Sequence, residues 1–167
     1  MAFRTDYDNY FTVEALDGEC RNHIDRYAQI MAFLDSRAGD SVLDVGAGTG
    51  ILAEKLLAKK YPAPIMNCDI KKEYVKAMTG KGLNAVEGDI RSLPFKDREF
   101  DTVIATEVLE HLANPGTGLA ELCRVAKKRI IFSLPVNCKD DFHGWMIKCE
   151  RVGGWWVVEM ERTEGND

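Results

Sequence analysis

The chain of 167 residues lacks long apolar runs. A helix that crosses a membrane needs about 18 or more consecutive apolar residues, and no segment of the sequence approaches that length. The N-terminal residues Met1–Tyr7 also lack the apolar core of a secretion signal. From these absences we expect neither a membrane partner nor secretion.

A paired cysteine pattern and an excess of basic residues are missing as well. The five cysteines are odd in number and form no C-x-x-C pair, which predicts reduced thiols in a cytoplasmic protein. Lysine and arginine total 22 against 27 aspartates and glutamates, which gives a net charge of −5. Because nucleic acids are bound by basic surfaces, we expect no nucleic-acid partner. These exclusions leave a single cytoplasmic domain of ordinary size.

The segment Ser41–Gly50 is the most informative part of what is present. Its residues 42–45 are mostly apolar, as expected for a buried parallel strand. Residues 51–59 predict a helix whose free N–H groups point toward a ligand. Dinucleotide sites place their third glycine where Ile51 stands, so the loop favours another cofactor. By itself it could also be a simple strand-to-helix turn. The loop contains three alternating glycines, Gly46, Gly48 and Gly50, which can adopt positive φ and let a ligand approach the backbone closely.

Two acids follow the next two predicted strands. Residues 64–68 predict a second strand that ends at Asp69, and residues 84–87 predict a third strand that leads to Asp89. Either acid alone would be explained as a helix cap or a turn residue. Since the carboxyl ends of parallel strands meet at one edge of a sheet, we expect both acids beside the glycine loop. A carboxylate at the first position can accept both hydroxyls of a ribose.

The alternation continues through the second half of the chain. Residues 100–105 predict a fourth strand, residues 119–126 an amphipathic helix, and residues 129–135 a fifth buried strand. We interpret Lys127-Lys128-Arg129 as a solvated turn at the sheet edge opposite the site. Before the glycine loop, residues 21–34 predict a helix that packs on the sheet.

These motifs resemble the class I S-adenosylmethionine-dependent methyltransferases, and in particular the methyltransferase type 11 group. The glycine run resembles motif I of that family, and the run from Phe100 to Leu112, with Glu-Val-Leu-Glu-His-Leu at its end, resembles the motif IV region. The resemblance covers about residues 21–135. It implies S-adenosylmethionine as the cofactor and a small-molecule methyl acceptor. The cofactor-binding residues that it implies are Asp44, Gly46, Gly48, Gly50, Asp69, Ile70, Asp89, Ile90 and Thr106.

The same resemblance implies a role for each of these positions. The glycines would cradle the methionine end of the cofactor. Asp44 would hold the loop and the methionine amino group. Asp69 would hold the ribose and Asp89 the adenine amino group. The adenine ring would lie between Ile70 and Ile90, while the Thr106 backbone and the Glu107 side chain would face the transferring methyl.

Acid–base chemistry at this edge would fall to His111 and Glu107. Histidine titrates near neutral pH and can take the proton of a hydroxyl or amine acceptor, although a capping or partly buried role is the alternative for His111. Glu107, Glu110 and His111 are spaced to share one helix face, and His143 follows the fifth strand. This set resembles a metal motif of some O-methyltransferases and would suit Mg²⁺ or Mn²⁺, but the same pattern also occurs in the family without metal.

The predicted fold is α/β, a doubly wound Rossmann-like parallel sheet in three α/β/α layers, shortened at the C-terminus. One domain spans 1–167. Residues 1–35 would form an N-terminal lid and helix, 41–135 the cofactor-binding core, and 136–167 truncated C-terminal strands. Tyr7, Tyr10 and Phe11 could line the lid or belong to a frayed terminus.

The C-terminal segment allows two predictions. In the first, Trp145–Val152 and Trp155–Arg162 form an antiparallel hairpin around Gly153-Gly154, with its first strand beside the fifth strand. In the second, Phe142, Trp145, Met146 and Cys149 follow helical spacing and form a short helix that the glycines stop. The hairpin is favoured because it needs no crossover helix.

Two functions from different classes remain for the chain. The first is an S-adenosylmethionine-dependent methyltransferase acting on a small molecule. The second is an S-adenosylmethionine-binding regulatory or scaffold module without its own acceptor site, which the short C-terminus motivates. A homodimer or a partner subunit could complete a shallow acceptor pocket. An NAD-dependent dehydrogenase is disfavoured by Ile51.

Overall fold

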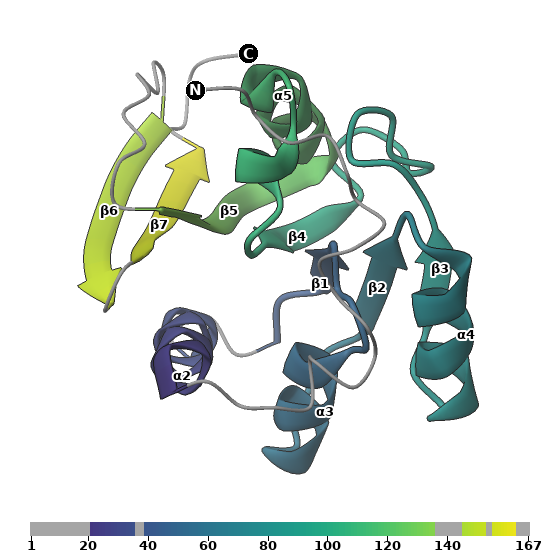
Figure 1. Ribbon diagram of the computed structural model, residues 1–167. Helices are drawn as coiled ribbons and strands as arrows, with labels where there is room; N and C mark the ends of the chain where they lie inside the picture. Colours follow the sequence, from purple (N-terminus) through teal and green to yellow (C-terminus); the bar gives the residue numbers. More distant parts are fainter. Residues whose placement is uncertain (1–20, 36–38, 136–144, 153–154, 163–167) are drawn as a thin grey trace.

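A mixed seven-stranded sheet with strand order β3-β2-β1-β4-β5-β7-β6 forms the centre of the computed structural model (Figure 1). The residues described are 21–35, 39–135, 145–152 and 155–162. The first five strands are parallel to one another, and β7 is antiparallel to both of its neighbours. The strands are β1 (Val42–Val45), β2 (Ile65–Asp69), β3 (Ala85–Glu87), β4 (Phe100–Ala105), β5 (Ala126–Pro135), β6 (Trp145–Val152) and β7 (Trp155–Arg162).

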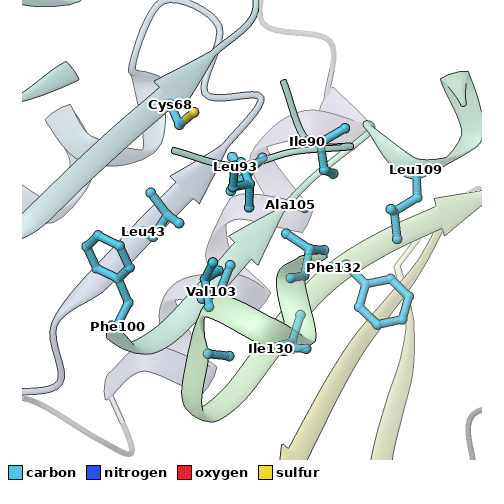
Figure 2. Close-up of a cluster of buried hydrophobic side chains, with 14 of the residues drawn as sticks. Leu43, Cys68, Ile90, Leu93, Phe100, Val103, Ala105, Leu109, Ile130 and Phe132 are labelled. Atoms are coloured by element: carbon cyan, nitrogen blue, oxygen red, sulfur yellow. The ribbon is translucent and has the colours of Figure 1, made fainter. Parts of the chain in front are cut away.

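Helices cover both faces of this sheet and confirm the three-layer prediction. One apolar cluster joins strand residues such as Val42 and Ile131 to three helices through Leu34, Leu52 and Met78. The other cluster packs the opposite face against the remaining helix and the short 3₁₀ turn before it (Figure 2). Among the described helices, none combines the length and apolar character that a bilayer crossing requires. The helices are α2 (Arg21–Asp35), α3 (Ile51–Ala58), α4 (Lys72–Gly80) and α5 (Pro115–Val125), with η1 (Leu109–His111) as the 3₁₀ turn.

Strand β1 lies at the switch point of the doubly wound sheet. It pairs with β2 on one side and β4 on the other, and all four of its residues are buried. A strand buried on both faces is expected to be apolar, and only Asp44 departs from that pattern. The glycine loop therefore begins where the two halves of the sheet diverge, which is the usual ligand position in such folds.

The C-terminal segment forms the hairpin, and the alternative helix is wrong. β6 and β7 pair from Trp145↔Arg162 to Val152↔Trp155. The expectation that β6 would lie beside β5 is also wrong, because β7 occupies that position. Val157, Val158 and Met160 of β7 are buried, as an inner strand requires. The sequence of β6 carries Lys148, Glu150 and Arg151, which suit the sheet edge.

The boundary between α5 and β5 also differs from the prediction. The helix begins at Pro115 and not at Leu119, because the Asn114 side chain caps it by accepting a hydrogen bond from Gly116 N at 3.1 Å. The strand begins at Ala126, so Lys127-Lys128-Arg129 lie within β5. The interpretation of these three residues as a solvated turn is therefore wrong.

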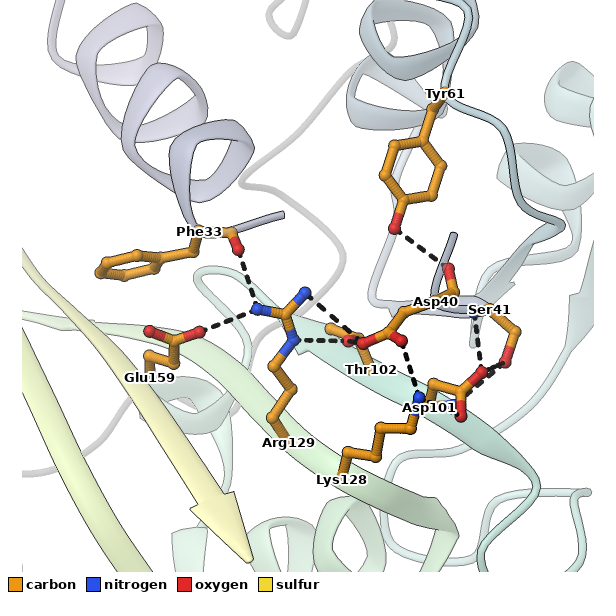
Figure 3. Close-up of polar contacts among 9 residues, drawn as sticks. All are labelled: Phe33, Asp40, Ser41, Tyr61, Asp101, Thr102, Lys128, Arg129 and Glu159. Atoms are coloured by element: carbon orange, nitrogen blue, oxygen red, sulfur yellow. Dashed lines mark hydrogen bonds and ion pairs between the residues drawn. The ribbon is translucent and has the colours of Figure 1, made fainter. Parts of the chain in front are cut away.

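Arg129 is fully buried, with 1% of its surface exposed, and lies at the centre of a polar network (Figure 3). Its guanidinium donates to Thr102 Oγ1 at 2.7 Å, to the Phe33 carbonyl at 2.8 Å and to Glu159 at 3.0 Å. Asp40 lies 3.7 Å from Arg129 Nη2. The partners come from α2, β4, β7 and the segment before β1, so one side chain joins elements from both ends of the described chain.

Neighbouring charges extend this network toward solvent. The ammonium of Lys128 lies 2.8 Å from Asp40 and 3.1 Å from Asp101. Asp101 Oδ2 in turn accepts from Ser41 N at 3.0 Å and from Ser41 Oγ at 2.8 Å, which joins the start of β4 to the start of β1. The network lies toward the amino ends of the strands, so it supports the sheet from the end opposite the glycine loop.

Candidate functional site

The glycine loop adopts the backbone predicted for it. Gly46, Gly48 and Gly50 have φ of 71°, 57° and 85°, a region that side chains with a Cβ rarely occupy. Space is restricted as well, because a Cβ added at Gly46 would lie 2.3 Å from Cγ2 of Val108. The loop is thus held against the segment that follows β4, which is where the sequence places the methyl-transfer chemistry.

Asp69 connects the glycine loop to the start of α4. Its Oδ2 accepts a hydrogen bond from Gly48 N at 2.8 Å, and its Oδ1 accepts one from Lys71 N at 2.9 Å. Burial raises the pKa of this carboxyl, although the two backbone hydrogen bonds act in the opposite direction. The prediction that the acid after β2 stands beside the glycine loop is confirmed by these contacts.

Asp44 is a buried acid directly below the loop. It is 3% exposed, and its Oδ1 accepts no hydrogen bond from any described residue. Burial, with a smaller contribution from the charge of Asp69, raises the pKa of Asp44 to about 8. A buried carboxylate of this kind is costly unless a cation or donor pairs with it. The ammonium of a bound methionine moiety is a group that this acid fits.

We expect Asp44→Asn to stabilise the ligand-free protein increasingly as pH rises. The folded-state pKa of Asp44 lies above its ordinary value of 3.8. The wild type therefore loses free energy of unfolding between about pH 4 and about pH 8, by at most about 1.4 kcal/mol per pH unit, and the variant does not. Urea unfolding of both proteins at about pH 5.5 and about pH 7.5 measures this. A stability difference that is the same at both pH values would contradict it.

The acid after β3 is engaged differently. The guanidinium of Arg91 donates to both carboxylate oxygens of Asp89, and Arg91 N donates to Asp89 Oδ1 at 2.8 Å. The side-chain hydrogen bond from Arg91 is the main reason that the pKa of Asp89 is lowered. This ion pair was not predicted, because an arginine two residues after an acid is an ordinary loop pattern.

The two isoleucines predicted to flank an adenine have contrasting surroundings. Ile70 is 50% exposed, which is unusual for a large apolar side chain, and it follows Asp69 directly. Ile90 is 7% exposed and belongs to the apolar cluster drawn in Figure 2. Ile70 therefore offers an exposed apolar surface next to Asp69, whereas Ile90 is part of the hydrophobic core.

The loop that carries Asp89 is fastened to α5. Arg124 donates to the carbonyls of Leu93 at 3.1 Å and Phe95 at 2.8 Å, and its ion pair with Glu121 orients it. Glu121 also accepts from Leu93 N at 2.8 Å. The contacts of Arg124 and Glu121 hold the loop between β3 and β4 in place, and neither residue belongs to the predicted site.

The segment after β4 turns sharply at Glu107. This residue has φ of 55°, in the left-handed region that is uncommon for a glutamate, and its N–H donates to the hydroxyl of Ser133 at 2.9 Å. The helical turn begins only at Leu109. The prediction that Glu107, Glu110 and His111 share one helix face is therefore wrong.

His111 remains exposed at the end of this segment. Desolvation by surrounding atoms lowers its pKa, and the nearby charge of Glu107 opposes that effect only in part. The imidazole is consequently neutral at physiological pH and able to accept a proton.

The residues of the predicted metal set do not assemble into a metal centre within the part of the chain that the structure describes. No group of three or more His, Cys, Asp or Glu side chains there is arranged to hold an ion. His143 lies outside the described residues, as do the lid residues Tyr7, Tyr10 and Phe11. The sequence left a Mg²⁺ or Mn²⁺ site open as one of two interpretations, and the helical spacing behind it is broken by the left-handed turn of Glu107.

Comparison with protein families gives a match at these same elements. The family model described as "Methyltransferase domain" (Methyltransf_11) matches residues 43–133, which is more than half of the chain. The match runs from β1 through the glycine loop to Ser133 in β5.

Similarity to individual proteins and solved structures extends beyond residues 43–133. The chain is 34% identical over 143 residues to the "Demethylmenaquinone methyltransferase" of Thermobifida fusca, covering 78% of this chain and 58% of that protein. It is 36% identical over 109 residues to the "Malonyl-[acyl-carrier protein] O-methyltransferase" of Herminiimonas arsenicoxydans, covering 64% of this chain and 41% of that one. A crystal structure of a SAM-dependent methyltransferase from Aquifex aeolicus superposes with a TM-score of 0.72 at 20% identity, covering 92% of this chain and all of the other. The chain thus spans about 40 to 60% of the length of the first curated relatives.

Proposed function

Because the chain belongs to the class I S-adenosylmethionine-dependent methyltransferases of the type 11 group, we propose that it binds S-adenosylmethionine at the glycine loop and methylates a small-molecule acceptor. One contact carries the proposal. Asp69, the acid assigned to the ribose, accepts a hydrogen bond through its Oδ2 from Gly48 N of the glycine loop at 2.8 Å. It brings together two motifs that lie 21 positions apart in the sequence.

The residues at the strand ends fit the cofactor in charge and in shape. Asp44 offers a buried carboxylate oxygen with no described partner to a cationic group. Gly46 leaves no room for a side chain, because Val108 of the segment after β4 packs against it. Asp69 is assigned to the ribose hydroxyls, and Ile70 provides an exposed apolar surface for the adenine. Asp89, Ile90 and the backbone of Thr106 are assigned to the adenine and methyl ends of the same site.

Residues after β4 are assigned to the acceptor side. When bound, S-adenosylmethionine supplies a methyl group on a sulfonium that is already electrophilic. The task of the protein is to align the acceptor and exclude water. His111, neutral because its pKa is lowered, takes the proton of a hydroxyl or amine acceptor. Glu107 lies close enough to influence that imidazole electrostatically, and it completes the proposed catalytic pair.

A small-molecule acceptor is supported by the names of the relatives. One is named for a demethylated quinone and another for a malonyl group on a carrier protein. The net charge of −5 gives no basic surface for a nucleic-acid acceptor. A homodimer or partner subunit that completes the acceptor pocket forms part of the same proposal.

Calorimetry followed by a transfer assay tests the proposed function. We expect S-adenosylmethionine and S-adenosylhomocysteine to bind with dissociation constants of about 1 to 100 μM, and NAD not to bind. Transfer of a labelled methyl group is then assayed with a demethylated quinone and a malonyl thioester. Absence of binding to either adenosyl compound would refute the proposal. Binding without turnover on any acceptor would favour the regulatory or scaffold alternative.

A further inference from the structure

The left-handed turn at Glu107 needs a structural cause. A glutamate in this region carries a strain of the kind that persists only when surrounding contacts impose it. β4 ends at Ala105, and Glu107 is the second residue after it. Ser133 of β5 stands one position past the last paired residues, Ala105↔Phe132, and its hydroxyl accepts the Glu107 N–H at 2.9 Å.

The turn has a consequence for the glycine loop. It directs Val108 onto Gly46, where Cγ2 of Val108 occupies the space that a Cβ at Gly46 would need. Leu109 and Leu112 then pack against Gly118 of α5, at 3.0 and 2.5 Å from the position of a Cβ there. The backbone conformation of Glu107 thus determines whether Val108 packs against the glycine loop.

We propose that Ser133 is a positioning residue that holds the Glu107 turn and thereby seats Val108 against the glycine loop. The proposal rests on the proposed function, since the loop is taken as the cofactor site. Ser133 is fully buried in β5 and pairs with Val157 of β7 on its other side. It therefore acts through the backbone of Glu107 and does not need to touch the cofactor.

Loss of the hydroxyl should weaken cofactor binding by lowering the population of the competent loop. An alanine at position 133 leaves the Glu107 N–H without its acceptor, so the strained turn competes with other backbone conformations. We expect Ser133→Ala to weaken the affinity for S-adenosylhomocysteine about fivefold. Ser133→Thr, which keeps the hydroxyl and suits a strand, should stay within about twofold of the wild type.

A double-mutant cycle separates positioning from general damage. Glycine adopts the left-handed region without strain, so in a Glu107→Gly background the Ser133→Ala change should cost less than about twofold. Exchange of the Glu107 amide hydrogen, followed by NMR, provides a readout that does not depend on the cofactor. We expect it to accelerate about fivefold in Ser133→Ala and to remain slow in Ser133→Thr.

The outcomes distinguish this proposal from the proposed function. If the wild type binds neither adenosyl compound, the proposed function fails, while amide exchange still tests the role of Ser133. If the wild type binds and Ser133→Ala binds equally well with unchanged exchange at Glu107, the positioning role is overturned. An equal loss of affinity with and without Glu107→Gly would also overturn it, because the loss would then not pass through the turn.

Discussion

Asp69→Ala is expected to weaken S-adenosylmethionine binding by at least about 100-fold, because two hydrogen bonds to a charged acceptor are together worth about 3 kcal/mol or more. The substitution also removes the acceptor for Gly48 N, so the loop itself loses a fixed point. Both effects lower the affinity for the cofactor, and they can be measured without knowing the methyl acceptor. Calorimetry with S-adenosylmethionine and S-adenosylhomocysteine measures the loss.

A matched control is available one strand away from Asp69. Glu87 ends β3 at the same edge of the sheet, and its half-exposed carboxylate forms only a 3.7 Å ion pair with Lys72. Glu87→Ala should bind the cofactor within about twofold of the wild type, since exposed pairs contribute little. Circular dichroism and thermal unfolding establish that both variants are folded. A folded Asp69→Ala protein with wild-type affinity would refute the assignment of Asp69 to the ribose.

Arg129→Ala is expected to lower the free energy of unfolding by about 3 to 5 kcal/mol. The change leaves the buried Thr102 hydroxyl, the Phe33 carbonyl and the Glu159 carboxylate without their donor. Breaking a buried ion pair costs more than the pair contributes, because the remaining charge stays desolvated. Urea unfolding measures the loss.

Charge compensation tests the cause of that destabilisation. Arg129→Met combined with Glu159→Gln removes both charges and keeps most of the volume, so we expect it to recover about half of the lost stability. Arg91→Ala is the surface control, since Arg91 is 63% exposed at the opposite end of the sheet and should change stability by less than about 1 kcal/mol. If Arg129→Ala were no more destabilising than Arg91→Ala, the network would not support the fold.

The sequence predicted those parts of the fold in which local pattern and burial agree. β1 and β2 were found because their apolar runs end at a glycine or an acid, and β4 was found from the apolar run that begins at Phe100; the structure confirms their ends at Val45, Asp69 and Ala105. The three positive φ values of the glycine loop followed from residue type alone. The hairpin of β6 and β7 was found from a glycine pair between two β-prone runs.

Other features could not be predicted, because they depend on contacts between distant residues. Nothing in Lys127-Lys128-Arg129 indicates that the third residue is buried, since its partners lie 96 positions before it and 30 after it. The turn at Glu107 depends on Ser133, a residue 26 positions later. Helical spacing alone therefore did not predict how Glu107 lies relative to Glu110 and His111.

The insertion of β7 between β5 and β6 has a consequence for how the chain folds during its synthesis. Glu159 follows Arg129 by 30 residues, so the guanidinium is synthesised before its carboxylate partner. Until β7 is made, β5 lacks the strand that pairs with its outer edge, even though the glycine loop and its acids are already present. The segment that carries the glycine loop is thus synthesised first, but β5 gains its second neighbour only when β7 pairs with it.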